Sequence, residues 1–211
     1  MTVHHLVLAA DLWGGNFDNL GIPESGNGRC DLLDEAKIDA DLLLKLQDTD
    51  GGFYTLLRPV ERKYDDDQDL SSTRPGDPMA AYPKSTQATA AAVAALAQIG
   101  SSPVFRSQFG NAAGDAYLAA AQAGWAWIQG LFATYGRNGA FQKIWHYGMM
   151  FSQDDELSWA AVELYLATGN DAYHNDVLTM PSYTTGVPFN PLDTRWRKWG
   201  WWQMYECVGA A

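Results

Sequence analysis

Apolar residues recur at helical spacing along most of this chain, and this periodicity constrains the fold more than any other feature. Four apolar residues of segment 31–47 follow at steps of four, four and three, which places them on one face of a helix: Leu32, Ala36, Ala40 and Leu43. Asp31 is the expected N-cap, because its carboxylate can accept a hydrogen bond from the free N–H groups of the first turn. Gly51 and Gly52 then predict a break in the helix.

The same spacing predicts further helices in these segments: 85–99, 111–134, 154–169 and, at the two ends, 3–12 and 195–210. Ser85 or Thr86 is expected to cap the first of them, and Gly100 to end it. The best strand signal lies in 51–57. The connection 58–83 is too long for a passive turn, so it is either a binding loop or locally mobile. The predicted class is all-α, with long loops between helix pairs.

Charge and hydropathy exclude two classes of partner. The net charge of −11 and the pI near 4.6 leave no basic surface for a phosphate backbone, so we expect no nucleic-acid partner. No run approaches the ~18 apolar residues of a membrane span, so we expect no membrane partner. The opening "MTVHHLVLAADLW" lacks a basic region and a small-residue cleavage site, and therefore does not predict a signal peptide.

The two cysteines, Cys30 and Cys207, lie far apart in the sequence. They could pair in an oxidising compartment, or both could be buried free thiols. The chain shows no zinc-ligand spacing.

Aromatic residues are abundant, with nine Trp and ten Tyr. In an acidic chain this content suits a carbohydrate partner, because sugar rings stack on aromatic faces and carboxylates accept hydroxyl hydrogen bonds; the alternative is that the rings fill the core. Two clusters stand out, at 143–151 and 195–205. Spacing alone does not separate a groove lining from packing against a neighbouring helix.

Adjacent carboxylates occur at Asp154-Asp155-Glu156 and at 65–67. Neighbouring side chains at a helix start point apart, so the first cluster is a poor acid–base pair. It either caps the helix or provides oxygen ligands for a hard cation such as calcium. We expect the 65–67 run to be a solvated loop and the "DTDGG" stretch at 48–52 to be a turn.

Several stretches resemble family 9 glycoside hydrolases, the inverting cellulases. The family's proline-glutamate-serine-glycine turn, asp-leu-leu-asp-glu helix and gln-asp-x-asp-gly-gly turn are matched in order by "LGIPESGNGRCDLLDEAKIDADLLLKLQDTDGGFY". Its thr-ala-ala-rich inner helix resembles "YPKSTQATAAAVAALAQ", and its asp-glu-leu-x-trp-ala-ala helix resembles "DDELSWAAVELYLATGNDAYH". The end segments "VHHLVLAADLW" and "RWRKWGWWQMYE" look like a bacterial subgroup, so the resemblance covers essentially the whole chain.

The resemblance implies an (α/α)6 barrel with an open cleft for a β-1,4-glucan or cello-oligosaccharide. It also implies an inverting mechanism, in which one carboxylate activates water and another, about 6.5–9.5 Å away, protonates the leaving oxygen. The family's asp-ala-gly-asp base motif and its acid glutamate do not occur in these 211 residues. We therefore expect 1–211 to be a partial catalytic domain with about half of the barrel helices, and we assign no catalytic residue. Glu24 matches a turn of the family and is assigned to loop architecture.

Binding residues follow from the resemblance as well. Four residues correspond to the family's calcium site, two through carboxylates and two through backbone carbonyls: Asp155 and Glu156, then Phe151 and Ser152. The implied cofactor is a structural Ca²⁺ ion. Tyr147 falls where the family has a cleft tyrosine, and Trp199 aligns with a glucan-stacking tryptophan.

Two functions remain as hypotheses: an endo-β-1,4-glucanase, and a catalytically inactive or glucan-binding fragment that lacks the base and acid motifs. The resemblance also implies secretion. Half a barrel would expose apolar stripes, and such patches favour association, so we expect a homo-oligomer if the chain exists alone.

Overall fold

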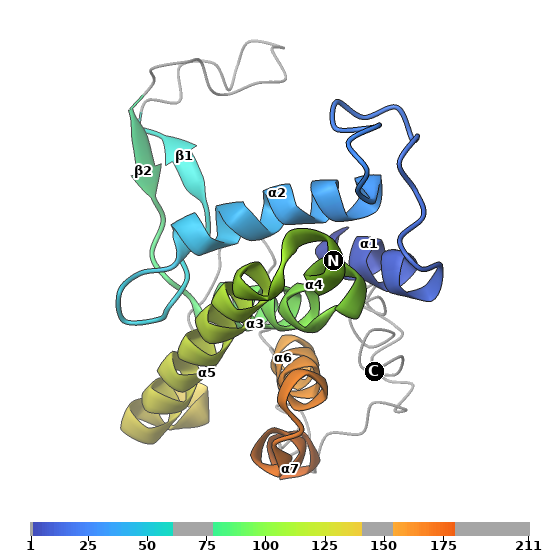
Figure 1. The fold of residues 1–211 in the computed structure, drawn as a ribbon. Coiled ribbons are helices and arrows are strands. Elements are labelled where there is room, and N and C mark those ends of the chain that lie inside the picture. The colour runs from blue at the N-terminus through green and yellow to red at the C-terminus, as the bar shows by residue number, and fades with distance from the viewer. Residues whose placement is uncertain (1, 61–77, 141–153, 180–211) are drawn as a thin grey trace, which may run out of the picture.

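Helices make up most of the structure, a computed structural model that describes residues 2–60, 78–140 and 154–179. In chain order the elements in these ranges are α1 (Thr2–Leu12), α2 (Asp31–Leu46), β1 (Leu57–Pro59), β2 (Met79–Ala81), α3 (Thr86–Ser101), α4 (Pro103–Phe109), α5 (Asn111–Ala140), α6 (Asp154–Thr168) and α7 (Asp171–Thr179). The prediction of an all-α fold is confirmed. The antiparallel hairpin of β1 and β2 stands at the C-terminal end of α2 (Figure 1).

Helix α3 lies at the centre and contacts α1, α2, α4, α5 and α6 (Figure 1). Small side chains such as Ala90, Ala94 and Ala97 are fully buried along it, which lets its neighbours approach closely. Helix α6 turns a buried stripe toward this core, formed by Leu157, Ala161 and Leu164. On α2 the fully buried positions include Ala36 and Ala40, as expected, with Leu33 rather than Leu32 beside them.

Helix boundaries follow the predicted ranges closely for α1, α2, α3 and α6. Helix α5 continues past the predicted end at 134, but its backbone leaves the helical conformation at Gly136, with φ 70° and ψ 161°. The short helices α4 and α7 were not predicted. The predicted helix over 195–210 lies outside the described residues.

Three local predictions are wrong. Gly100 does not end α3, which continues to Ser101 with Ser102 at the C-cap, because Gly100 lies inside the helix where it packs closely against Gly114 of α5. Cys30, not Asp31, occupies the N-cap position of α2, because the Asp31 carboxylate is drawn into the preceding loop, where Leu20 N and Ser25 Oγ donate to its Oδ2 at 2.7 and 2.6 Å. The strand over 51–57 is not formed either. A glycine turn takes up its first residues and Phe53 is buried with only an isolated bridge to Gln47, so regular pairing begins at Leu57.

No single helix in the described part of the chain is long and apolar enough to cross a membrane. The bent pair of α3 and α4, at 68°, meets the criteria by length and composition only.

Candidate functional site

The first turns of α3 and α6 lie against each other and join Gln87 to Glu156. Gln87 Nε2 donates to Glu156 Oε1 at 2.7 Å. Glu156 is only 2% exposed, and its other oxygen, Oε2, has no hydrogen-bond partner within the described ranges; the same holds for Gln87 Oε1, which is also buried. A buried acceptor without a donor is costly, and more so when it carries charge. The pair therefore marks a place where an added cation or donor would be stabilising.

The sequence positions Gln87 through the cap of α3. Ser85 Oγ accepts a hydrogen bond from Ala88 N at 3.1 Å, which confirms Ser85 as the capping residue. Thr89 Oγ1 donates to the Ser85 carbonyl at 2.7 Å and accepts from Phe53 N at 3.0 Å. The cap thus holds the first turn of α3 and, through Thr89, the backbone of Phe53 in the connection after α2.

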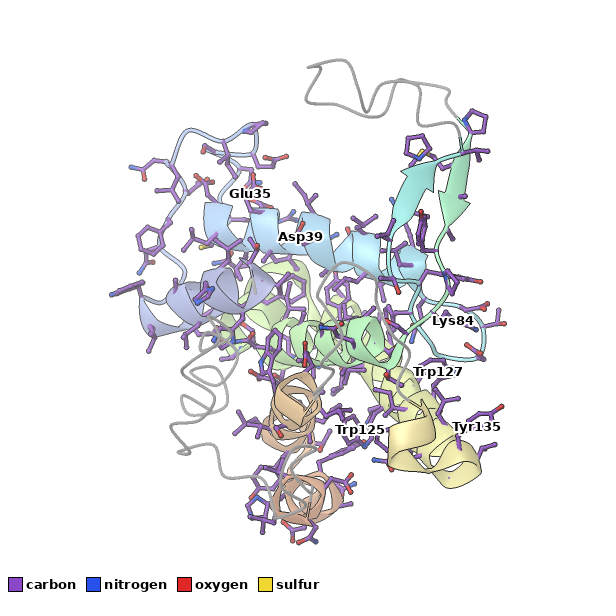
Figure 2. All side chains as sticks on the ribbon, turned by 180° about the vertical axis from the view of Figure 1, so that it is seen from behind. Glu35, Asp39, Lys84, Trp125, Trp127 and Tyr135 are labelled. Atoms are coloured by element: carbon purple, nitrogen blue, oxygen red, sulfur yellow. The ribbon has the colours of Figure 1, made fainter. Side chains whose placement is uncertain are left out.

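Lys84, the residue before that cap, joins three segments in what we call the Lys84 cluster: Lys84, Asp48, Asp50, Tyr54 and Trp127. Figure 2 labels Lys84 and Trp127 of this cluster. The Lys84 ammonium donates to Asp48 Oδ2 at 2.7 Å and to Asp50 Oδ2 at 2.6 Å. Trp127 Nε1, from α5, donates to Asp50 Oδ2 at 3.1 Å, and the Tyr54 hydroxyl donates to Asp48 Oδ2 at 3.1 Å. The cluster joins the turn after α2 to α5 and to the start of α3.

Electrostatics in the Lys84 cluster reinforce this role. Hydrogen bonding by Lys84, helped by Tyr54, lowers the pKa of Asp48 to about 2. The same ammonium lowers the pKa of Asp50, and the two carboxylates raise the pKa of Lys84. Every charge in the cluster has a partner of opposite sign, so we assign the cluster to positioning α3 rather than to catalysis.

The stretch 48–52 forms a turn, as predicted. Gly51 N donates to the Asp48 carbonyl at 2.9 Å, and Gly51 has a φ of 98°. A side chain at Gly51 would place its Cβ 2.5 Å from the carbonyl oxygen of Ala123 in α5. Only glycine satisfies both the backbone angle and this close approach.

A second buried polar group links α1, α3 and α6. Trp159 Nε1 donates to Glu163 Oε1 at 3.0 Å, and His4 Nδ1 lies 3.7 Å from the same oxygen and 3.1 Å from Gln98 Oε1. Within the described ranges no three or more His, Cys, Asp or Glu side chains are grouped so as to hold a metal ion. We regard this group as a satisfied polar network of the core.

The predicted calcium and substrate residues are only partly described. Glu156 is buried on α6, whereas for Asp155 the structure describes the helical backbone and not the side chain. Four others lie outside the described residues: Tyr147, Phe151, Ser152 and Trp199. The acidic run 65–67, both aromatic clusters and Cys207 also lie outside them, while Cys30 is a buried free thiol.

Glu24 lies in the loop before α2, where its carbonyl accepts a hydrogen bond from Asn27 N at 3.2 Å. Its Oε2 atom is buried and has no hydrogen-bond partner in the described part of the chain. The backbone turn agrees with the loop role that we assigned to this residue.

Sequence reasoning missed Gln87 and the Lys84 cluster. Gln87 is an amide at the start of an alanine-rich inner helix, where the neighbouring positions that share its face are apolar, and that contrast was the available signal. The Lys84 cluster had no such signal, because its charged residues are about 35 positions apart, the separation that Lys84 bridges to Asp48 and Asp50.

Comparison with known proteins finds similarity along nearly the whole chain. A family model described as glycosyl hydrolase family 9 matches residues 1–210. A xyloglucan-specific endo-beta-1,4-glucanase of Bacteroides ovatus is 33% identical over 170 residues, which are 75% of this chain and 28% of the relative. A cellulose 1,4-beta-cellobiosidase of Acetivibrio thermocellus is 32% identical over 175 residues, or 78% of this chain and 19% of the relative. The chain spans less than a third of the length of these curated relatives.

Solved structures give the same result for the fold. A metagenome-derived glycoside hydrolase family 9 endoglucanase matches with a TM-score of 0.65 and 28% identity over 91% of this chain and 34% of that one. A Bacteroides ovatus protein described as GH9 matches with a TM-score of 0.62 and 26% identity over 83% of this chain and 33% of that one. The prediction of a partial (α/α)6 barrel is confirmed.

Proposed function

The chain belongs to glycosyl hydrolase family 9, and we propose that it acts as part of a cellulase-like enzyme that hydrolyses β-1,4-glucans or cello-oligosaccharides. The observation that carries this proposal is the family match across residues 1–210. The substrate class is supported by the names of two relatives, which describe an endo-β-1,4-glucanase specific for xyloglucan and a cellobiosidase of cellulose. The acidic, tryptophan-rich composition also suits a sugar ligand.

Inverting hydrolysis needs one carboxylate that activates water and a second that protonates the leaving oxygen. The family's motifs for both groups are absent from the 211 residues. We therefore propose that this chain contributes substrate binding and structural support, with Tyr147 and Trp199 against the sugar. The proton-transfer groups are assigned to none of its residues.

We further propose that Asp155 and Glu156 bind a structural Ca²⁺ ion together with the backbone carbonyls of Phe151 and Ser152. Calcium takes six to eight oxygen ligands, and carboxylates and carbonyls are its usual ones. The unpaired, buried Oε2 of Glu156 supports the proposal, because a cation would compensate an oxygen to which no group in the described residues donates a hydrogen bond. The ion would hold the start of α6 in place.

Hydrolysis is tested by release of reducing ends from carboxymethyl-cellulose, xyloglucan and cello-oligosaccharides. We expect turnover on at least one of them when the acid and base carboxylates are supplied by the rest of a catalytic domain, with the anomeric configuration of the first product inverted when it is followed by NMR. Trp199→Ala should weaken glucan binding, and Trp13→Ala, which changes an indole that is 62% exposed, serves as the matched control. Binding without turnover would establish the glucan-binding alternative. A chain that neither binds nor hydrolyses any of these glucans would overturn the proposal.

Calcium is tested separately by thermal unfolding in EDTA and in calcium. A ligand at 100 times its Kd stabilises the folded state by about 2.7 kcal/mol, so the Tm should rise with calcium concentration. Glu156→Gln should remove most of that rise. An identical Tm in EDTA and in calcium would refute the calcium site and leave the glucanase proposal standing.

We also propose an extracellular location and, for the chain by itself, a homo-oligomer. Large apolar side chains that are more than half exposed fit the second proposal, among them Leu12, Trp13 and Leu20. Light scattering that gives a single monomeric mass would contradict it.

A further inference from the structure

The contact between Gln87 and Glu156 leaves two acceptor atoms without a donor in the part of the chain that the structure describes. Because Gln87 Nε2 donates to Glu156 Oε1 at 2.7 Å, the orientation of the amide is fixed and its oxygen is left over. Gln87 Oε1 and Glu156 Oε2 are both buried and both lack a hydrogen-bond partner among the described residues. An amide oxygen and an ionised carboxylate can only accept, so neither atom can satisfy the other.

The charge of Glu156 also lacks a counter-ion in the part of the chain that the structure describes. Lys84 lies only three positions before Gln87, but its ammonium is held by Asp48 and Asp50. The other ion pairs recorded in these ranges join His4 to Glu163, Lys37 to Asp41 and Arg106 to Asp115. A buried carboxylate is stable only when a positive charge or several donors compensate it.

We propose that Gln87 is a cation ligand, and that its Oε1 atom and Glu156 Oε2 bind the same divalent ion. This inference rests on the calcium site of the proposed function and adds to it a ligand from a second helix. Calcium accepts amide carbonyl oxygens at about 2.3–2.6 Å and tolerates irregular shells, so an ion can span two acceptors on neighbouring helices. The ion then joins the first turn of α3 to the first turn of α6. Its binding free energy stabilises the packing of those two helices, besides holding the start of α6.

The test is calorimetric titration of Ca²⁺ into the EDTA-stripped chain. Gln87→Met keeps the length of the side chain and removes its oxygen, and should weaken binding at least about tenfold, since loss of even a supporting partner of a ligand costs that much. Gln98→Met is the matched control, because it changes a half-buried glutamine at the other end of α3 that contacts His4. We expect the control to keep the affinity of the wild type.

Each outcome decides the matter. Unchanged affinity in Gln87→Met would overturn the role of Gln87 and leave calcium at Glu156 standing, whereas a wild type that binds no calcium would overturn both. Hydrolysis of glucans is assayed separately and depends on neither result.

Should Gln87→Met fail to fold, Gln87→Glu keeps the inference falsifiable. A cation between the two carboxylates predicts that calcium restores the Tm of Gln87→Glu to that of the wild type. If a bridging water rather than a cation joins the two side chains, the Tm of Gln87→Glu stays low at every calcium concentration, which would refute the proposal.

Discussion

The crossing of α3 and α5 predicts whether a glycine-to-alanine substitution raises or lowers the free energy of unfolding. The two helices approach through Gly100 and Gly114, where an added methyl group on Gly100 would lie 2.8 Å from Gly114 O, 2.9 Å from Leu118 N and 3.2 Å from Tyr117 Cβ. The two closest atoms belong to the backbone, so they cannot rotate out of the way. Gly100→Ala must therefore push the helices apart.

The size of the effect follows from two opposing contributions. Alanine in place of glycine inside a helix stabilises the fold by about 0.5–1 kcal/mol. Overpacking a tight contact costs about 1–3 kcal/mol, so the net change for Gly100→Ala is a loss of up to about 2 kcal/mol. A methyl group added to Gly130, in α5, would instead meet open space, with no neighbouring atom within 4 Å. Gly130→Ala should therefore stabilise the fold by the full amount of about 0.5–1 kcal/mol that alanine contributes in place of glycine inside a helix.

Urea unfolding of the two variants beside the wild type measures this difference. We expect the free energies of unfolding to move in opposite directions and to differ by about 2 kcal/mol, or about 4–8 °C in Tm for a chain of this length. A Gly100→Ala variant as stable as Gly130→Ala would refute the close approach of α3 and α5.

Three further predictions concern polar groups. The pKa of Asp48, lowered to about 2 mainly by Lys84, means that this contact stabilises the fold above about pH 4 and loses its effect as the pH falls toward 2. The stability gap between wild type and Lys84→Met should therefore be smaller at pH 3 than at pH 6, and a gap independent of pH would contradict the assignment. Trp159→Phe removes the indole donor to Glu163 and should cost about 1–3 kcal/mol in urea unfolding; an additive double mutant with Glu163→Gln would argue against that contact. Ser85→Ala should cost about 1 kcal/mol, and an unchanged midpoint would show that the cap of α3 is not energetically significant.

Periodicity was sufficient to predict the long helices, because a buried stripe repeats locally and needs no knowledge of the partner. Leu157, Ala161 and Leu164 recur at helical spacing, and they form the buried face of α6. The short helix α4 was not predicted, because seven residues are too few to show a helical period. Ser102 before Pro103 is nevertheless a recognisable helix start.

The candidate site was predicted less completely, because it depends on contacts between distant residues. The acidic start of α6 suggested either a cap or a cation, and the family resemblance favoured the cation at Glu156. That Gln87 would face Glu156 across 69 positions is a property of how α3 and α6 pack. No local pattern in the sequence carries that information. The oligomeric state and the substrate residues Tyr147 and Trp199 stay predictions.

The bonds from Lys84 to Asp48 and Asp50 have a consequence for how this architecture can vary. They close the connection between α2 and α3 at its base, so the position of α3 does not depend on the residues beyond that closure. Doubling the length of a closed loop costs only about 0.6 kcal/mol in chain entropy. A change in the length of the chain between β1 and β2 should therefore leave the packing of α3 unaltered.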